Sequence, residues 1–199
     1  MLNIDTLILG TYQTNCYVLR QADSCACLLI DPGDKPQTVA QFLSQQALQP
    51  AAILLTHGHF DHVGAVQPLA QQFGCPVYLN EKETALPPFM TAGPLHYTHT
   101  YRNGDTLSLA DMTLQVMETP GHTPGSVCLV VENNLFSGDT LFAGSCGRVD
   151  FPGSSPADMR RSLTRLAALE PNYTVYPGHG EPTSLHYEQQ TNPYMRGAL

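Results

Sequence analysis

The chain has 199 residues and carries 17 acidic against nine basic side chains, a formal net charge of −8. This balance argues against a nucleic-acid-binding protein, because such proteins need a basic patch and the sequence shows none. No apolar run approaches the roughly 18 residues of a membrane span, and the first residues do not form a signal peptide. We therefore expect a cytoplasmic protein that folds as a single domain over residues 1–199.

Hydrophobic patterning predicts strands and helices that alternate along the chain. Short apolar or alternating runs predict strands over 4–10, 15–20, 25–31, 51–55, 75–79, 114–118, 135–139 and 173–179. Helical spacing of apolar residues predicts helices over 36–48, from 61 onward, over 158–169 and over 185–190. Strands interleaved with helices favour an α/β fold over an all-β sandwich.

Three of these helices are predicted to bury one apolar face each. In the first helix the buried side chains are expected to be Val39, Phe42, Leu43 and Ala47. In the helix that begins at Asp61 they are expected to be Val63, Val66, Leu69 and Ala70. In the helix over 158–169 they are expected to be Met159, Leu163, Leu166 and Leu169.

The most informative segment directly follows the strand predicted over 51–55. It places three imidazoles and a carboxylate within six positions, at His57, His59, Asp61 and His62. These groups are ligands that divalent transition metals prefer. The first two histidines project to the same side of an extended chain, whereas the other pair falls where a helix begins, so one segment can serve two adjacent metal positions. The alternative is a polar loop with scattered histidines, but four such groups are costly to cluster without an ion.

Further candidate ligands stand where other predicted strands run out into Gly or Pro. His122 follows the strand over 114–118, Asp139 ends the strand over 135–139, and His179 ends the last predicted strand. The candidate metal ligands are therefore His57, His59, Asp61, His62, His122, Asp139 and His179. The remaining histidines lie in polar surroundings and are predicted to face solvent: His96, His99 and His186.

The order and spacing of these seven residues resemble the metallo-β-lactamase fold superfamily, over nearly the whole chain from residue 2 to about residue 194. The resemblance implies a four-layer αβ/βα sandwich, with two mixed β-sheets face to face, helices on the outer faces and the metals at one edge. It implies one ion held by His57, His59 and His122. It implies a second ion held by Asp61, His62 and His179, with Asp139 bridging the two. We expect two divalent ions, zinc in the first place, with iron or manganese as alternatives.

Two bridged ions predict a hydrolase. Metal binding lowers the pKa of water from about 15.7 to about 7, so a hydroxide that bridges the ions is a nucleophile at neutral pH. The same ions can polarise a substrate carbonyl. Asp61 is predicted to orient the hydroxide and Asp139 to set the separation of the ions, so we count both as catalytic. Asp31 and Thr56 are candidates for fixing the imidazoles, although an Asp before Pro-Gly is more usually a turn residue.

The local sequence is similar to the glyoxalase II branch, the hydroxyacylglutathione hydrolases. The similarity lies in the segments 121–126 and 136–142, and the segment 147–153 resembles the short bacterial glyoxalase II-like proteins. The resemblance implies a cytoplasmic thioesterase that cleaves S-2-hydroxyacylglutathione, such as S-lactoylglutathione. The partner is then a small-molecule thioester, with no nucleic acid and no membrane.

Arg148 matches the basic residue with which glyoxalase II contacts its thiol cofactor. A surface salt bridge is the alternative for this side chain. Val149 and Asp150 stand where glyoxalase II carries a Phe-Tyr pair, whose Tyr helps to bind glutathione. This departure leaves a different thiol open, as well as other esters or lactones.

Two further alternatives differ in chemistry. Persulfide dioxygenases resemble the segment 147–151 and use a single iron, which would be held here by His57, His122 and Asp139. The metal count discriminates, because two ions favour hydrolysis and one Fe(II) favours oxygen chemistry. A structural scaffold is the non-enzymatic alternative, but structural zinc sites are closed and often rich in Cys, whereas these ligands are His and Asp from separate segments.

The remaining predictions concern the cysteines and one apolar segment. Five cysteines are predicted to be reduced and packed in apolar strands: Cys16, Cys25, Cys27, Cys75 and Cys128. Cys146 lies in a Gly-containing loop that we expect near the site, where a thiol could take part in the chemistry. The segment 87–90 is predicted to be an exposed apolar loop that lines the site, meets a partner or forms a mobile flap. The oligomeric state stays open.

Overall fold

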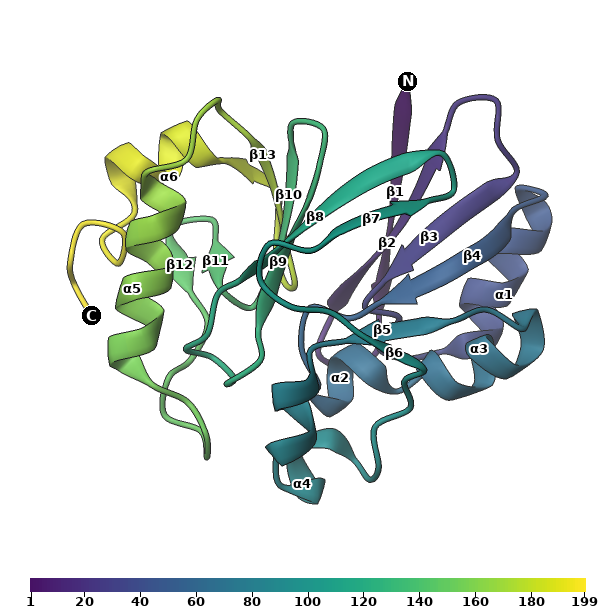
Figure 1. Ribbon diagram of the computed structural model, residues 1–199, viewed down its shortest axis with the longest axis horizontal. Coiled ribbons are helices and arrows are strands. Elements are labelled where there is room, and N and C mark those ends of the chain that lie inside the picture. The colour runs from purple at the N-terminus through teal and green to yellow at the C-terminus, as the bar shows by residue number, and fades with distance from the viewer.

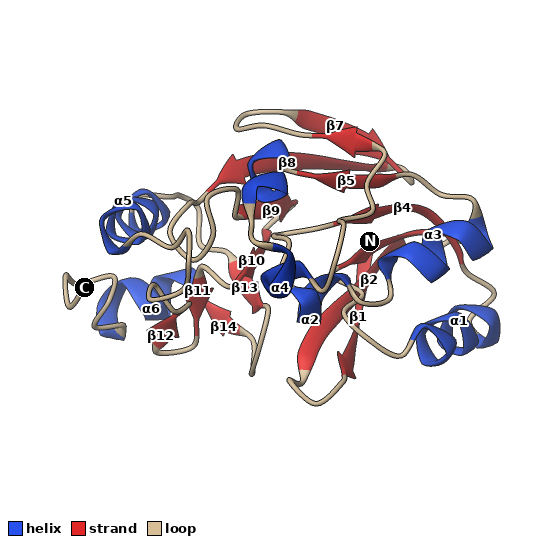
Figure 2. Ribbon diagram, turned by 90° about the horizontal axis from the view of Figure 1, so that it is seen from below, coloured by secondary structure: helices blue, strands red, loops and turns tan.

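A computed structural model describes residues 1–199 and shows two β-sheets packed face to face between helices (Figure 1). Helices α1 (Pro36–Gln45) and α3 (Val66–Phe73) cover the outer face of the first sheet. Helices α5 (Pro156–Ala167) and α6 (Leu185–Thr191) lie on the opposite side of the molecule, against the second sheet (Figures 1 and 2). The predicted four-layer arrangement with two mixed sheets is confirmed.

The first sheet contains six strands in sequence order. They are β1 (Leu2–Leu9), β2 (Thr14–Gln21), β3 (Ala26–Ile30), β4 (Gln49–Leu54), β5 (Val77–Leu79) and β6 (His99–Thr100). The first three strands pair antiparallel, and the last four pair parallel. Because β3 and β4 are parallel neighbours, their carboxyl ends lie at the same edge of the sheet.

The second sheet also contains six strands, in the order β14-β13-β10-β9-β8-β7. The strands are β7 (Thr106–Leu109), β8 (Met112–Glu118), β9 (Val127–Val131), β10 (Asn134–Gly138), β13 (Thr174–Pro177) and β14 (Thr183–Ser184). All neighbours are antiparallel except β10 and β13, which are parallel. The carboxyl ends of β8, β10 and β13 therefore share one edge.

Short elements connect or flank the two sheets. The two-stranded ribbon consists of β11 (Leu141–Phe142) and β12 (Ser145–Cys146). The remaining helical turns are α2 (Phe60–Val63), α4 (Pro88–Thr91) and the 3-10 helix η1 (Glu81–Ala85). Figure 1 shows α2 and α4 close together, and residues of the two helices are in contact.

Alternate residues of the central strands face two different apolar cores. On β3, Leu28 and Ile30 face the space between the sheets, whereas Cys27 and Leu29 pack in the core beneath α1 and α3. The strand β9 alternates in the same way between the inter-sheet core and a third core beneath α5 and α6. Because both faces of these strands are buried, their sequences are continuously apolar, and the predicted strands of both sheets are confirmed.

The helix predicted from Asp61 is divided into α2 and α3, so the prediction of one continuous helix is wrong. The N–H of Ala65 donates to the carbonyl oxygen of Pro32 at 3.0 Å instead of continuing the helical ladder. The backbone of Gly64 lies directly against the carbonyl of Gly33, where a side chain would overlap it. The close approach of the turn at 32–33 therefore interrupts the helix.

Three other expectations need correction. Ala47 is exposed with a φ of 54°, because α1 ends earlier and the Leu48 N–H turns back to the Leu43 carbonyl at 2.8 Å. Cys25 is exposed and precedes β3, whereas all six cysteines are free as expected. The segment predicted as a loop contains the short helix α4, in which Phe89 is 71% exposed while Met90 is buried.

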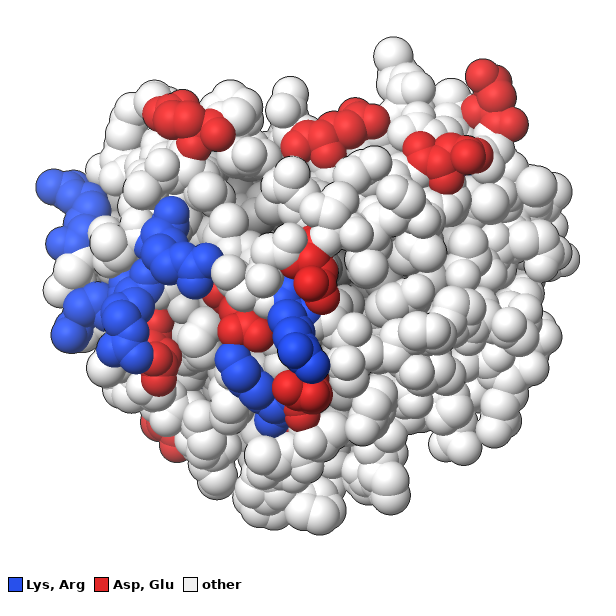
Figure 3. All heavy atoms as spheres, viewed as in Figure 1, with Lys and Arg blue, Asp and Glu red and all other residues white.

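Charged side chains are sparse on the face shown in Figure 3. Basic side chains gather there on the side of α5 and around the middle of the face, where acidic side chains lie among them. None of the helices has the length and apolar character needed to cross a membrane.

Candidate metal centre

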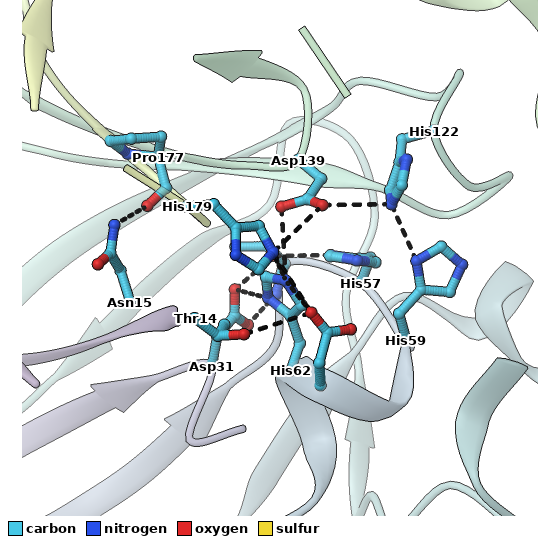
Figure 4. A network of polar contacts seen from close by, with 12 residues as sticks. Thr14, Asn15, Asp31, His57, His59, His62, His122, Asp139, Pro177 and His179 are labelled. Atoms are coloured by element: carbon cyan, nitrogen blue, oxygen red, sulfur yellow. Dashed lines mark hydrogen bonds and ion pairs between the residues drawn. The ribbon is translucent and has the colours of Figure 1, made fainter. Parts of the chain in front are cut away.

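All seven candidate ligands converge at the edge where strands of both sheets end. Figure 4 labels all of them except Asp61. The donor atoms form two groups, each with its atoms within 4.8 Å of one another. The first group is His57, His59 and His122. The second group is Asp61, His62 and His179. These two sets are called the first and second donor groups below.

Asp139 lies between the two groups at the end of β10. Its Oδ2 lies 3.4 Å from the Nε2 of His122, and its Oδ1 lies 3.4 Å from the Nε2 of His62. The Oδ2 atom also lies 3.7 Å from the Nε2 of His179, so the carboxylate contacts imidazoles of both donor groups. This is the arrangement that a carboxylate shared by two cations requires.

The loop after β4 divides its side chains between the groups because its backbone changes conformation. His59 has extended angles, with φ −66° and ψ 146°, and it precedes α2. His57 and His59 therefore belong to an extended stretch, whereas Asp61 and His62 lie in the first turn of α2. The change from extended chain to helix is what directs the second pair toward His179.

Hydrogen bonds fix the tautomers of four of the imidazoles. The Nδ1 atom of His122 lies 2.8 Å from the Arg148 carbonyl oxygen, and that of His179 lies 3.0 Å from the Tyr12 carbonyl oxygen. A carbonyl oxygen only accepts, so each Nδ1 carries the proton. The Nε2 of each ring faces the centre of the site and is the nitrogen left to bind a cation.

Asp31 and Thr56 settle the other two tautomers. Asp31 accepts from the Thr56 hydroxyl at 2.5 Å and from the Thr56 N–H at 2.8 Å. The hydroxyl has then used its proton, so it accepts from the Nδ1–H of His57 at 3.1 Å. The oxygen of Asp31 that accepts from the Thr56 hydroxyl, Oδ2, also accepts from the Nδ1–H of His62 at 3.0 Å. Both residues therefore orient imidazoles of the site rather than serve as ordinary turn residues.

Several buried atoms of the ligand side chains have no hydrogen-bond partner. The Nε2 atoms of His57 and His59 and the Oδ1 atom of Asp139 are buried without one. Between His59 and His122, Nδ1 and Nε2 face each other at 2.9 Å. Buried polar atoms are normally paired, so this cluster of unpaired lone pairs fits divalent cations. The nitrogen and oxygen donors of the site suit zinc, iron and manganese alike.

Two imidazoles of the first donor group, those of His57 and His59, are neutral in the metal-free protein. Burial, followed by the neighbouring imidazoles, holds the pKa of His57 well below 6.5. The same causes lower the pKa of His59 to about 4. At neutral pH both lone pairs are therefore free for a metal ion.

The second donor group is a charged network. Burial opposes a charge on His62, but the carboxylates of Asp139 and Asp31 outweigh it and hold the pKa of His62 well above 6.5. Burial likewise opposes a charge on His179, and Asp61 and Asp139 raise its pKa. The same imidazoles hold the pKa of Asp139 well below its usual range, against the effect of burial. Protons thus occupy this group when no cation is bound.

Apolar side chains border the site at both ends. Beside Asp61, a groove of about 240 Å³ is lined by the loop after β1 and by Phe60, whose ring packs edge-on against Tyr12 at 5.1 Å. Beside the first donor group, the Phe151 ring lies 5.8 Å from that of His59. The two metal positions therefore lie between two aromatic walls.

Arg148 lies on the rim next to the first donor group. Its guanidinium forms two hydrogen bonds of 2.9 Å to Asp150 and lies 4.2 Å from the centre of the Phe151 ring. Its side chain is 65% exposed. The salt bridge considered as the alternative for Arg148 is present, and its backbone carbonyl also orients His122.

Cys146 does not have the properties of a nucleophile. It is half-buried in β12, and burial raises the pKa of its thiol to about 11. A reactive cysteine needs a lowered pKa, so the thiol chemistry considered for this residue is not supported. Of the remaining histidines, His99 and His186 are exposed as predicted, and His96 is half-buried.

Two contacts of the site were missed by the sequence analysis. Thr14 donates its hydroxyl to Asp61 at 3.3 Å, and the Tyr12 carbonyl orients His179. Tyr12 lies in the turn between β1 and β2 and Thr14 is the first residue of β2, both far from the ligands in sequence. A backbone carbonyl leaves no trace in residue identity, and a Thr next to a turn has an ordinary local explanation.

Comparison with known proteins identifies relatives along most of the chain. The family model of the metallo-beta-lactamase superfamily matches residues 9–179. A Bacillus subtilis protein described as the probable metallo-hydrolase YqgX is 35% identical over 94% of this chain and 95% of its own length. A hydroxyacylglutathione hydrolase of Nitrosomonas eutropha is 44% identical over 76% of this chain and 56% of its own length.

Two crystal structures have closely similar folds. The B3 metallo-β-lactamase BLEG-1 superposes with a TM-score of 0.90 and 36% identity, covering 98% of this chain and 100% of that one. TTHA1623 in a di-iron-bound form superposes with a TM-score of 0.85 and 39% identity, covering 96% of this chain and 99% of that one.

Proposed function

The chain belongs to the metallo-β-lactamase superfamily, and we propose that it is a binuclear metal-dependent hydrolase of S-2-hydroxyacylglutathione or a closely related thioester. The observation that carries the proposal is the position of Asp139 between the two donor groups, with its carboxylate within 3.7 Å of imidazoles of both. The similarity to a hydroxyacylglutathione hydrolase supports the choice of thioester. Zinc is the proposed metal.

The donor set determines where the ions would lie. The three imidazoles of the first donor group would hold one ion and the second donor group the other, with Asp139 between them. Two such ions lower the pKa of water and polarise a carbonyl oxygen. The hydrogen bonds behind the imidazoles keep their lone pairs directed at these positions, which limits reorganisation during the reaction.

Asp61 is the proposed proton acceptor for the attacking water. Its Oδ2 accepts from Thr14 and lies 3.3 Å from the Nε2 of His179. Its Oδ1 is then available to orient the water. The side chain is 15% exposed and borders the groove next to Tyr12 and Phe60. Water and the acyl carbon can therefore meet at one place, while the groove leaves room for the acyl group.

Arg148 is the proposed contact for the carboxylates of the thiol. It lies on the rim beside the first donor group, at the end of the site opposite the groove. Its guanidinium is exposed but already paired with Asp150. An anionic thiol would therefore have to compete with Asp150 for the guanidinium. The expected preference for glutathione over other thiols is for this reason only modest.

The test combines metal content with substrate turnover. Anaerobically purified protein is analysed for metals, and hydrolysis of S-lactoylglutathione is followed at once. About two ions per chain with thioester cleavage are expected, with turnover lost in Asp139→Asn and kept in Asp111→Asn, an exposed position remote from the site.

Other outcomes point to different chemistry. One iron per chain with oxygen uptake on glutathione persulfide would overturn the proposal in favour of a mononuclear dioxygenase. Two ions without thioester cleavage would retain the metal centre and reject the substrate. Lactones, simple esters and a cephalosporin are then the next substrates, the last because of the likeness to BLEG-1.

A further inference from the structure

A buried carboxylate outside the two donor groups connects the loops that carry the first one. Glu83 lies in η1 and is completely buried. Its Oε2 accepts from the N–H of Gly58 at 2.6 Å, and its Oε1 accepts from the N–H of Gly125 at 2.6 Å. Gly58 stands between His57 and His59, and Gly125 lies three residues after His122.

The two glycines allow this close approach. A Cβ atom at Gly125 would lie 2.7 Å from the Oε1 of Glu83, and one at Gly58 would lie 3.2 Å from its Oε2. Gly58 is also covered by Leu95, whose Cδ1 atom would lie 3.1 Å from such a Cβ. The carboxylate therefore fits closely between two loops that come from different sheets.

The geometry fits a carboxylate: burial raises the pKa of Glu83, and the hydrogen bonds from Gly58 and Gly125 oppose that shift. Both oxygens face an N–H donor, and no Lys or Arg forms an ion pair with Glu83. A protonated oxygen or an amide nitrogen would direct a second donor at one of these N–H groups. The charge is maintained by two short charge-assisted hydrogen bonds in a buried position.

The position of η1 is itself fixed. The side chain of Asn80 accepts from the Lys82 N–H at 3.0 Å at the start of the turn, and it donates to Glu118 at 2.9 Å. Lys82 also pairs with Glu118 at 2.7 Å. Glu83 is thus presented from a segment anchored to the end of β8, where the loop that carries His122 begins.

We propose that Glu83 is a positioning residue that fixes the spacing between the loop of His57 and His59 and the loop of His122, so that the first donor group is preformed for its ion. The inference rests on the proposed function only in assuming that the first donor group binds a metal. It assigns no contact with substrate to Glu83.

The test is the binding of Zn²⁺ to the metal-free protein, measured by competition with a chromophoric chelator. In Glu83→Gln one oxygen becomes an NH₂ group, so one hydrogen bond is lost and two donors face each other. We expect the affinity of the first donor group to fall about 10- to 100-fold, the usual effect of removing a partner behind a ligand. The second donor group should keep its affinity. The site affected is identified by comparison with His59→Ala, which should weaken the same one.

Glu188 supplies the matched control. It is also completely buried, and it accepts from Gly144, Thr183 and Asn192, in a region away from the donor groups. Glu188→Gln should lower the thermal stability by a similar amount and leave both zinc affinities unchanged. If Glu83→Gln does not fold, Glu83→Asp is measured in its place, because it keeps both acceptors but cannot reach both loops.

The outcomes separate this inference from the proposed function. Unchanged zinc affinities in the Glu83 variant, or an equal fall at both donor groups, would overturn the positioning role. An equal fall in zinc affinity in the Glu188 variant would show that the effect reflects general stability, and this would also overturn the positioning role. Wild-type protein that binds two ions but cleaves no thioester would reject the proposed substrate while the role of Glu83 stands. Wild-type protein that binds no zinc would reject both.

Discussion

The Nδ1–H of His62 donates to Asp31 across 3.0 Å, and both side chains are almost completely buried. The same carboxylate receives the hydroxyl of Thr56, which in turn accepts from His57. One carboxylate therefore orients a histidine of each donor group, directly in one case and through a hydroxyl in the other. The two metal positions are connected behind the ligands as well as through Asp139.

Replacement of Asp31 should affect both positions. Asp31→Asn supplies an NH₂ group where His62 or Thr56 donates, so at least one buried donor loses its partner. We expect a loss of about 1–3 kcal/mol in the free energy of unfolding and about 10- to 100-fold weaker zinc binding. Urea unfolding and zinc titration measure these effects. Asp23→Asn, at an exposed position, is the control and should change neither; wild-type zinc affinity in Asp31→Asn would contradict the prediction.

Zinc binding to the two donor groups should depend differently on pH. His57 and His59 have lowered pKa values, that of His59 about 4, so no proton competes for them between pH 8 and 6. His62 and His179 have raised pKa values, so a cation must displace their protons. Each displaced proton weakens binding about tenfold for every pH unit below the relevant pKa.

Acidification from pH 8 to 6 should therefore weaken zinc binding at the second donor group, while His57 and His59 stay unprotonated. Zinc titrations at three pH values, with proton release recorded in weakly buffered solution, test this prediction. The ion in the second group should leave first as the pH falls. Equal pH slopes for both ions would show that the carboxylates do not hold protons on His62 and His179 as described.

Removal of the metal should abolish activity without unfolding the chain. Three apolar cores stabilise the two sheets and their helices, and the donor groups lie at one edge of this framework. After chelation the far-ultraviolet circular dichroism should persist and unfolding should remain cooperative, at a lower melting temperature. Activity should return when zinc is added. Loss of secondary structure on chelation would instead indicate a structural metal site.

Release of Arg148 from its partner should favour anionic substrates. Asp150→Asn removes the charge that occupies the guanidinium, so the KM for S-lactoylglutathione should fall about two- to fivefold, the range expected for an exposed ion pair. Arg148→Ala should raise that KM, with kcat nearly constant in both variants. A neutral thioester, S-lactoyl-N-acetylcysteamine, should show no change. An equal shift for both substrates would exclude recognition of the thiol carboxylates by this pair.

The strands and the strand-end residues could be predicted because they follow from local rules. Apolar runs identify β4, β10 and β13, and the polar residue at the end of each run lies at a shared edge of the sheets. The division of the helix after Asp61 could not be predicted, since it depends on the turn at 32–33, which approaches only in the folded chain. Local periodicity carries no information about that approach.

The role of Glu83 could not be predicted from the sequence for the same reason. In the sequence it is one of two glutamates beside a lysine, the usual composition of a solvated turn. Its burial depends on two glycines 25 and 42 residues away. Asp31 could be proposed as a partner of the imidazoles because it stands at the end of a predicted strand, whereas nothing in the local pattern marks Glu83.

The contact between β2 and the end of β13 has a consequence for synthesis of the protein. Asn15 donates to the carbonyl oxygens of Pro177 and Gly180, next to His179. A nascent chain that ends before β13 already contains His57, His59 and His122, but it lacks His179 and the carbonyl oxygens to which Asn15 donates. The first ion can be acquired while translation continues, whereas the second donor group is completed only when the two ends of the polypeptide meet.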